Sequence, residues 1–407
     1  MTDDDLSPEH AELAATVRRF AAEEVAPVIG DYYRREAFPY PVVAKMGDMG
    51  LFGLPFPEDY GGMGGDFLAF CLALEELARV DSSVAITLEA AVGLGAMPIY
   101  RFGTDDQRRR WLPDLCAGRA LGAFGLTEPD GGSDAGATRT TARRDGDQWV
   151  VDGSKAFITN SGTDITSLVT VTAVTGRSGG GGGTGGAAAG GGAAGGGPGA
   201  GRPEISAIVV PAGTPGFTVA PAYSKVGWAA SDTHELAFAG CRVPADHLLG
   251  QEGRGYAQFL EILDEGRIAI AALSVGLAQG CVDECVRYLG DRHAFGHPIG
   301  QSQVLQFKLA DMDARAHVAR LAWRDAARRL AAGRPFKREA AIAKLVASEA
   351  AVANAREASQ VFGGSGFMND TPAGRFYRDA KILEVGEGTS EVQRMLIARH
   401  LGLPVRP

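Results

Sequence analysis

The stretch TRTTARRDGDQWVVDGSKAFIT, residues 138–159, decides the fold class. It joins two runs rich in β-branched and aromatic residues through the turn Asp145-Gly146-Asp147, a pattern typical of a β-hairpin. Residues 205–210 and 235–238 have the composition of further strands. We therefore expect a compact β domain over residues 121–244.

The segments on both sides of this region have helical patterns. Ser7 can cap a first amphipathic helix, and Pro8 suits its first position. Further helical patterns cover about 67–80, 82–101, 104–117, 253–289, 300–331, 337–362 and 389–402. The Ala-rich tracts among the last of these are typical of a helical bundle. The predicted fold class is α+β and multidomain, with an N-terminal helical domain (1–120), a central β domain (121–244) and a C-terminal helical bundle (245–407).

The β domain contains an insert, residues 176–203, that consists almost entirely of Gly and Ala. It has too little apolar side-chain surface to offset the entropy of ordering, so we expect a flexible loop between strands. A phosphate-binding loop is the alternative. Such loops need glycines at fixed positions and a following helix, and this stretch has neither.

Charge and composition narrow the possible partners and compartments. The chain has 49 acidic and 40 basic side chains and a net charge of -9, which disfavours nucleic acid or an anionic membrane as the main partner. The sequence has no continuous run of about 18 apolar residues, and its beginning is acidic rather than basic or apolar. We expect a cytoplasmic protein with no membrane insertion.

The five cysteines are scattered and odd in number, which is unlike a disulfide framework. Cys281 and Cys285 are spaced to share a helix face. Without two further ligands nearby they do not make a metal site, and no metal is predicted.

The segment 124–134, FGLTEPDGGSD, combines a short strand with a polar turn. Its two adjacent glycines expose backbone N–H groups, and Thr127 and Ser133 add hydroxyls. Such a turn can bind a polar ring edge and a phosphate. Taken alone, Gly131-Gly132 would equally suit a plain β-turn.

Two acidic positions near helix ends are candidates for a role in the chemistry of a site. Glu387 precedes Thr389 and Ser390, which can cap the last helix, and Ser390 with Gln393 fits a capping box. A carboxylate there is held by a rigid helix start, although it could simply complement the helix dipole. Asp264 and Arg267 share a helix face, and their spacing alone favours a surface ion pair.

Three groups of motifs, in this order, resemble the acyl-CoA dehydrogenase family over nearly the whole chain. They are 124–134 with 157–159; 225–238 with 242–244; and 360–364 with 378–382 and 385–394. The resemblance implies an FAD enzyme that oxidises an acyl-CoA to the trans-2-enoyl-CoA and passes electrons to an electron-transfer flavoprotein.

The resemblance assigns the catalytic base to Glu387. Burial would raise its pKa toward working pH. Its backbone N–H and a flavin ribityl hydroxyl would stabilise the thioester oxygen. Some relatives place the base instead at the position of Gly266. Glu265 is adjacent, but one step along a helix turns a side chain by about 100°.

The resemblance also implies which residues bind the cofactor and substrate. The cofactor residues are Phe124, Leu126, Thr127, Gly132, Ser133, Phe157, Ile158, Thr159, Arg292, Phe295, Gln303, Gln360, Val361, Gly363, Gly364, Thr389 and Glu391. The substrate residues are Ser133, Asp264, Arg267 and Gly388. Phe157 replaces the usual Trp, which keeps ring stacking but loses the indole N–H.

The residues from Arg292 to Gly364 in this set match positions that contact FAD from a neighbouring subunit, which implies an oligomer, typically a tetramer. Taken singly, Arg292 could be a solvated charge and Gly363-Gly364 a helix terminator.

Gly386 stands where many relatives carry Tyr, so we expect a wider pocket that accepts short or branched acyl chains. Two rival functions remain: a flavin oxidase or monooxygenase on the same fold, and a catalytically silent acyl-CoA-binding protein.

Overall fold

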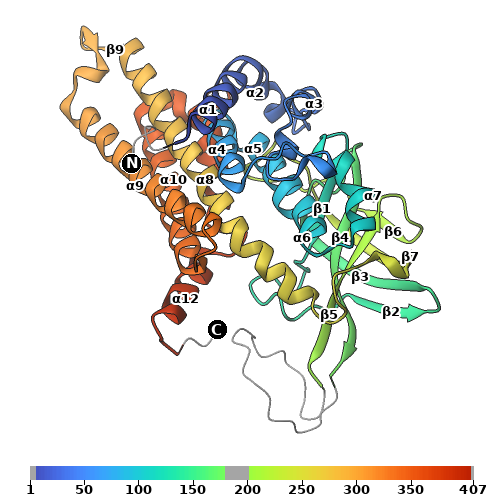
Figure 1. Cartoon of the computed structure of the whole chain (residues 1–407). Coiled ribbons are helices and arrows are strands. Elements are labelled where there is room, and N and C mark those ends of the chain that lie inside the picture. The colour runs from blue at the N-terminus through green and yellow to red at the C-terminus, as the bar shows by residue number, and fades with distance from the viewer. Residues whose placement is uncertain (1–5, 179–200, 405–407) are drawn as a thin grey trace.

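A computed structural model describes residues 6–178 and 201–404 of the chain. Figure 1 shows a helical N-terminal part, a twisted sheet and a long C-terminal helical bundle. The predicted fold class is confirmed by this order of elements.

The N-terminal part is a layer of helices around a large apolar core. Its elements are α1 (Pro8–Phe20), η2 (Ala21–Val25), α2 (Ala26–Arg34), α3 (Tyr40–Asp48), η3 (Leu51–Gly53), η4 (Glu58–Tyr60), α4 (Phe67–Ala78), α5 (Ser82–Glu89), η5 (Ala90–Ala96), α6 (Met97–Phe102) and α7 (Asp105–Cys116). As predicted, Ser7 Oγ accepts a hydrogen bond from the His10 backbone N–H and Pro8 begins α1. The sequence patterns did not predict α3.

The central part is a sheet in which β1 joins β4 in parallel while the hairpin strands lie side by side. Its strands are β1 (Leu121–Gly125), β2 (Thr141–Asp145), β3 (Gln148–Thr159), β4 (Thr166–Arg177), β5 (Pro203–Pro211), β6 (Phe217–Val219), β7 (Thr233–Pro244) and β8 (Leu248–Leu249). The order is β6-β7-β3-β2-β4-β5-β8, with η6 (Ala245–His247) before β8. The predicted hairpin is present as the antiparallel pair β2 and β3, with Gly146 at a φ of 63° in its turn.

Strand β4 was missing from the prediction, although its sequence alternates Thr and Val and its middle is buried. The expected Gly-rich loop is also shorter at its edges than predicted, because β4 continues to Arg177 and β5 begins at Pro203. The rest of that loop, residues 179–200, lies outside the described residues.

The C-terminal part is built on one long helix. Its elements are α8 (Gly255–Asp291), β9 (His293–Ala294), β10 (His297–Pro298), η7 (Ile299–Gln301), α9 (Gln303–Ala331), α10 (Lys337–Phe362), η8 (Gly363–Phe367), α11 (Pro372–Leu383) and α12 (Ser390–His400). Helix α8 passes through the middle of the molecule, between the N-terminal helices and α10 (Figure 1). Helix α11 was not predicted, although Thr371 caps it and Pro372 begins it.

Two helical stretches are long and apolar enough to cross a membrane by length and composition, Ser82–Phe102 and Gly255–Asp291. Their most apolar windows are 89% and 83% buried inside the fold, respectively. Their apolar character is therefore accounted for by packing in the core. The five cysteines are likewise buried and free, and the described residues contain no cluster that could hold a metal ion.

A single buried carboxylate connects all three parts of the chain. Asp379 in α11 accepts hydrogen bonds from Tyr33 Oη of α2 at 2.6 Å, Ser82 Oγ of α5 at 2.8 Å and the Trp228 backbone N–H at 2.7 Å. Trp228 lies in the loop that leads into β7. The orientation of α11 relative to α5 and the sheet is therefore fixed by polar contacts as well as by packing.

We expect Asp379→Ala to destabilise the fold by about 3 kcal/mol or more, because three buried donors lose their acceptor. Asp31→Ala is the matched control, because this aspartate pairs with Arg34 on the surface and its side chain is 64% exposed. It should cost no more than about 0.5 kcal/mol. Urea unfolding followed by circular dichroism measures both, and equal losses would show that Asp379 has no special role.

Candidate active site

Glu387 lies in the short connection between α11 and α12 and has an unusual backbone. Its φ is 51°, and the following Gly388 has a φ of 93°. The left-handed region costs an L residue about 1–2 kcal/mol, so the surrounding structure has to hold it there. Gln393 Nε2 donates to the Gly388 carbonyl at 2.9 Å, and Lys344 Nζ donates to the same oxygen at 2.8 Å. The backbone that carries the carboxyl is thus fixed by two side chains.

The predicted capping box is wrong. Thr389 is the N-cap of α12, and its Oγ1 accepts from the Val392 backbone N–H at 3.3 Å. Ser390 is already the first helical residue, which moves Gln393 out of the capping position. Gln393 is instead buried and holds the connection that contains Glu387.

Helix α8 faces the Glu387 carboxyl through a glycine. A Cβ added to Gly266 would lie 2.3 Å from Glu387 Oε2, so only glycine leaves room for that oxygen. The neighbouring Glu265 turns away and forms an ion pair with Arg101 of α6. The expectation that Glu265 cannot replace a residue at 266 agrees with this geometry.

The Glu387 carboxyl is in a dry and charged environment. Both of its oxygens are buried, and burial raises its pKa above the ordinary glutamate value. A hydrogen bond with Glu89 and the charges of Lys344 and Arg267 act in the opposite direction. A buried carboxylate with a raised pKa is suited to act as a general base near neutral pH.

Glu89, the last residue of α5, was not identified from the sequence. Burial raises its pKa well above the usual range. The negative charge of Glu387 and a hydrogen bond with Glu387 raise the pKa further. The available signal was one acidic residue inside an apolar helical run, ITLEAAVG. Glu89 reaches Glu387 because α5 approaches the α11–α12 connection. This is a tertiary contact, which local sequence patterns do not reveal.

Asp264 and Arg267 form a buried pair, contrary to the surface ion pair that their spacing favoured. Their side chains are 10% and 7% exposed, and Lys337 Nζ reaches the second oxygen of Asp264 at 2.6 Å. Arg267 Nε is buried and no described residue accepts its proton. The tertiary packing of α8 against its neighbours overrides the surface position that a local pattern indicates.

The predicted ring-binding residues gather at the end of β1 and in β3. Phe124 in β1, Leu126 just after it and Ile158 in β3 are buried, while Phe157 is 66% exposed, with its ring beside Tyr223. Phe157 also has a left-handed φ of 61°. An exposed aromatic ring on strained backbone fits a surface that a flat cofactor would cover.

The polar turn after β1 offers fewer free donors than predicted. The Gly131 backbone N–H donates to the Glu128 carbonyl at 3.0 Å and is already used inside the turn. Gly132 stays open, since no atom lies within 4 Å of a Cβ built on it. Lys155 Nζ stabilises the turn by donating a hydrogen bond to Glu128 Oε1 at 2.7 Å. Close approach of a ligand at Gly132 is therefore sterically possible.

A second group of predicted cofactor residues meets around a cavity of about 310 Å³. It is lined by Tyr288, Arg292, Ile299, Val361, Phe362, Gly363, Gly364 and Ser365. Gln360 lies in the last turn of α10 and Gln303 begins α9. Phe295, in the turn between β9 and β10, is 99% exposed.

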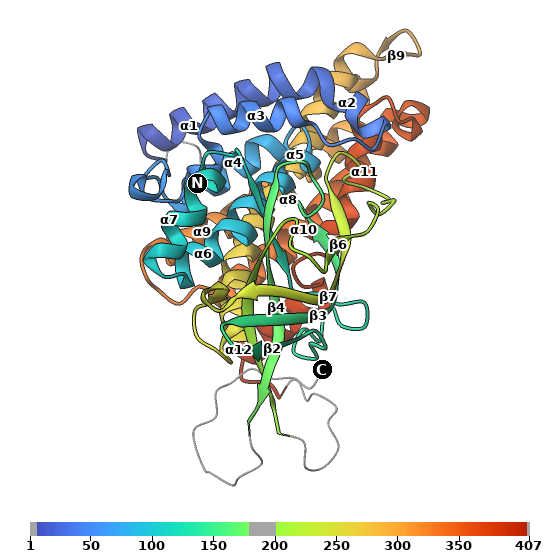
Figure 2. The same cartoon turned by 90° about the vertical axis from the view of Figure 1, so that its right-hand side faces the viewer.

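The two groups do not lie together within one chain. In Figure 1 the β9–β10 turn lies at the upper left and the sheet lies on the right; in Figure 2 this turn is at the upper right and the sheet runs through the centre. Thr389 and Glu391, at the start of α12, lie next to Glu387 in the chain.

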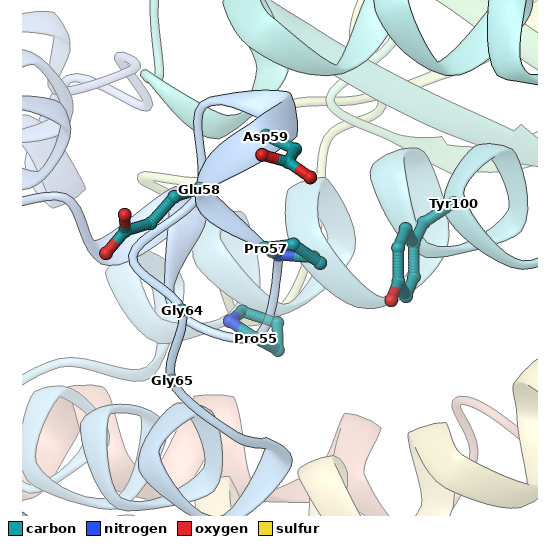
Figure 3. Close-up of a pocket in the computed structure, with 7 residues that line it drawn as sticks. All are labelled: Pro55, Pro57, Glu58, Asp59, Gly64, Gly65 and Tyr100. Atoms are coloured by element: carbon teal, nitrogen blue, oxygen red, sulfur yellow. The ribbon is translucent and has the colours of Figure 1, made fainter.

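Another cavity, of about 400 Å³, contains none of the predicted site residues. It lies between the η4 turn and α6, lined by Pro55, Pro57, Glu58, Asp59, Gly64, Gly65 and Tyr100 (Figure 3). Two acidic side chains, Glu58 and Asp59, line this cavity, and their negative charge disfavours the phosphates of a CoA thioester.

Three family models match consecutive parts of the chain. They describe the acyl-CoA dehydrogenase N-terminal domain at residues 7–119, the middle domain at 123–241 and the C-terminal domain at 253–402. The mitochondrial short-chain specific acyl-CoA dehydrogenase of Rattus norvegicus is 42% identical over 398 residues, which cover 98% of this chain and 91% of that protein.

Solved structures show the same similarity. Butyryl-CoA dehydrogenase from Megasphaera elsdenii has a TM-score of 0.88 and 37% identity, covering 98% of this chain and 99% of its own. A glutaryl-CoA dehydrogenase from Mycobacterium smegmatis in complex with FADH2 has a TM-score of 0.89 and 30% identity, covering 99% and 97%. The fold, the motifs and these similarities agree: this chain belongs to the acyl-CoA dehydrogenase family.

Proposed function

We propose that this chain is an FAD-dependent acyl-CoA dehydrogenase in which Glu387 removes the α-proton of a short-chain acyl-CoA. The observation that carries this proposal is the Glu387 carboxyl, which is buried, held on fixed backbone and aimed at Gly266 of α8. The product is the trans-2-enoyl-CoA. Membership of the family and the FADH2 complex of a similar enzyme support the cofactor.

The chain's own residues supply the acid–base part of the reaction. A Glu387 oxygen takes the α-proton, and burial raises the pKa of this carboxyl toward working pH. The Glu387 backbone N–H donates to no described residue, so it is available to the thioester oxygen as negative charge develops there. When bound, FAD would supply the acceptor for the hydride of the β-carbon. Phe157 and the open turn at Gly132 would hold its ring.

A short acyl chain is favoured by the residues before the base and by the relatives. A Cβ on Gly386 would meet only Ile382, with its carbonyl oxygen at 3.4 Å, so a wide space remains beside the base. The similar enzymes are named short-chain specific and butyryl-CoA dehydrogenases. We therefore place butyryl-CoA and small branched chains before long straight chains.

The electron acceptor and the oligomer follow from the same proposal. An electron-transfer flavoprotein would reoxidise the flavin. The β9–β10 turn and the sheet lie in different parts of one chain (Figure 1), so a second copy would bring its Arg292 and Phe295 to the FAD held by the first. A tetramer built from two such dimers satisfies all sites.

The first test is anaerobic titration of the purified flavoprotein with butyryl-, isovaleryl- and octanoyl-CoA. We expect butyryl- or isovaleryl-CoA to bleach the flavin. In Glu387→Gln the rate of bleaching should fall by a factor of at least about 10³, because the base is removed. Bleaching by octanoyl-CoA alone would contradict the short-chain assignment. Undiminished bleaching in the variant would exclude Glu387 as the base, and rapid peroxide formation in air would favour an oxidase.

The glycine that faces the base provides a second test. Gly266→Ala places a methyl group 2.3 Å from Glu387 Oε2, so the carboxyl has to move, and we expect the rate of flavin reduction to fall about tenfold or more. Gly290→Ala makes the same change on the same helix, where a Cβ would meet no atom within 4 Å. Stopped-flow reduction by butyryl-CoA compares the two, and equal rates would contradict the proposed position of the base.

Co-expression tests the shared cofactor site. Arg292→Ala alone should weaken FAD retention about tenfold, because a charge at the pyrophosphate position is lost, and Glu387→Gln alone should be inactive. Mixed oligomers would contain sites with Glu387 from one chain and Arg292 from the other. We expect partial recovery of activity and flavin content in the co-purified mixture. No recovery, in a mixture shown to contain both chains, would mean that each site is complete within one chain.

A further inference from the structure

Two buried carboxyls meet at the site, from parts of the chain about 300 residues apart in sequence. Glu89 ends α5, and Glu387 lies before α12. Each is accommodated by a glycine. A Cβ on Gly93 would lie 2.8 Å from Glu89 Oε1, and a Cβ on Gly266 would lie 2.3 Å from Glu387 Oε2. The absence of a side chain at these two glycines, one in η5 and one in α8, therefore leaves the space that the two carboxyls occupy.

The hydrogen-bond donors around the pair do not satisfy two ionised carboxylates. All four oxygens are buried, and as carboxylates they receive no hydrogen bond from the residues that the structure describes. Lys344 Nζ is engaged with the Gly388 carbonyl, and Arg267 is engaged with Asp264. Two adjacent negative charges without donors are strongly unfavourable. One proton between them removes one charge and supplies one donor.

We propose that Glu89 is a positioning residue that carries this proton and donates it in a hydrogen bond to the Glu387 carboxylate. The proposal rests on the function proposed above, because it concerns how the base of that reaction is kept ionised and aimed. Glu89 does not touch the reacting carbon; it acts through Glu387.

The assignment of the proton to Glu89 follows from the surrounding charges. Burial raises the pKa of both carboxyls, but Lys344 of α10 and Arg267 of α8 lower that of Glu387. For Glu89 every influence raises the pKa.

The titratable groups next in line around the pair are acidic or neutral. The charge of Glu89 acts on the Cys71 thiol of α4, and Glu384 after α11 and Glu391 of α12 act on Lys344. None of them adds a positive charge beside Glu89.

The proton count gives the pair a defined cycle. At rest it holds one proton and one negative charge. When the Cα–H bond breaks, an O–H bond forms on Glu387; the hydride of the β-carbon, with its electron pair, would go to the bound FAD. The pair then holds two protons and no charge, and Glu387 has to release one proton before the next turnover.

This cycle predicts two titrations in the pH dependence of kcat/KM. Protonation of Glu387 produces the acidic limb. At alkaline pH Glu89 loses its proton, the base loses its donor, and two negative charges face a substrate on which negative charge develops, so activity falls again. Glu89→Gln keeps an N–H donor of similar shape but cannot ionise. The alkaline limb should therefore disappear in this variant.

The test compares wild type, Glu89→Gln and Glu265→Gln as holoenzymes. Glu265 is the matched control, because burial also raises its pKa but it pairs with Arg101. We expect the alkaline limb in wild type and Glu265→Gln and its loss in Glu89→Gln, with kcat at neutral pH changed by less than about tenfold.

Infrared spectroscopy without substrate gives a second readout that does not depend on turnover. A protonated-carboxyl C=O band should be present in the wild-type-minus-Glu89→Gln difference spectrum at neutral pH and absent from the wild-type-minus-Glu265→Gln difference spectrum, because the bands of other buried acids such as Asp81 cancel in both. The proposal requires both results. It is overturned if Glu89→Gln retains the alkaline limb, if wild type lacks that limb, or if the wild-type-minus-Glu89→Gln difference spectrum lacks the band. If no acyl-CoA reduces the flavin, the proposed function fails, and the band alone then decides whether the proton resides on Glu89.

Discussion

The hydrogen bonds to Asp379 are the constraint on which the site depends. Helix α11 leads directly into the connection that carries Glu387, and α5 ends at Glu89. Asp379 joins these two helices through Ser82, and it also holds the backbone of Trp228 in the loop before β7. A rotation of α11 would therefore move the base relative to both α5 and the sheet. The catalytic geometry is set by a contact that lies outside the site itself.

The same region concentrates buried acids, which have an energetic cost. Asp81 caps α5 and lies close to Asp379; burial and the charge of Asp379 raise its pKa to about 7. Arg375 offsets part of this charge, with Nε at 3.6 Å from Asp81 Oδ2. Helix α5 thus begins at one buried acidic cluster and ends at another. The acids at both ends of this helix are poorly solvated, and the packing of its apolar faces contributes to offsetting that cost.

Sequence reasoning succeeded where the signal was local. The hairpin at 138–159, the cap at Ser7 and the long helical tracts depend on turn chemistry and periodicity within a few residues. The motif resemblance identified the family for the same reason, because the residues of each motif are consecutive in the chain. These parts of the fold and the site required no knowledge of distant contacts.

It failed where a distant segment decides the outcome. Glu89 looked like one acid in an apolar helix until α5 was seen to meet the α11–α12 connection. The i,i+3 spacing of Asp264 and Arg267 is typical of an ion pair on a helix surface, but neighbouring helices cover both side chains. Gln393 had the right spacing for a capping box, yet the strained backbone at Glu387 and Gly388 uses its amide instead.

The burial that raises the pKa of Glu387 and suits it to the proposed role of base also makes the fold depend on pH. A carboxyl whose folded pKa lies above its unfolded value binds more protons in the folded state between the two values. The contribution of these two carboxyls to stability is therefore largest below the unfolded pKa, near 4.5, and falls as the pH rises toward the folded value. A proton retained by Glu89 confines this loss to one charge instead of two at the pH where the base has to be ionised. The carboxyl pair thus reconciles two demands that a single buried glutamate cannot meet: a dry and basic oxygen beside the substrate, and a hydrogen bond that holds it in place.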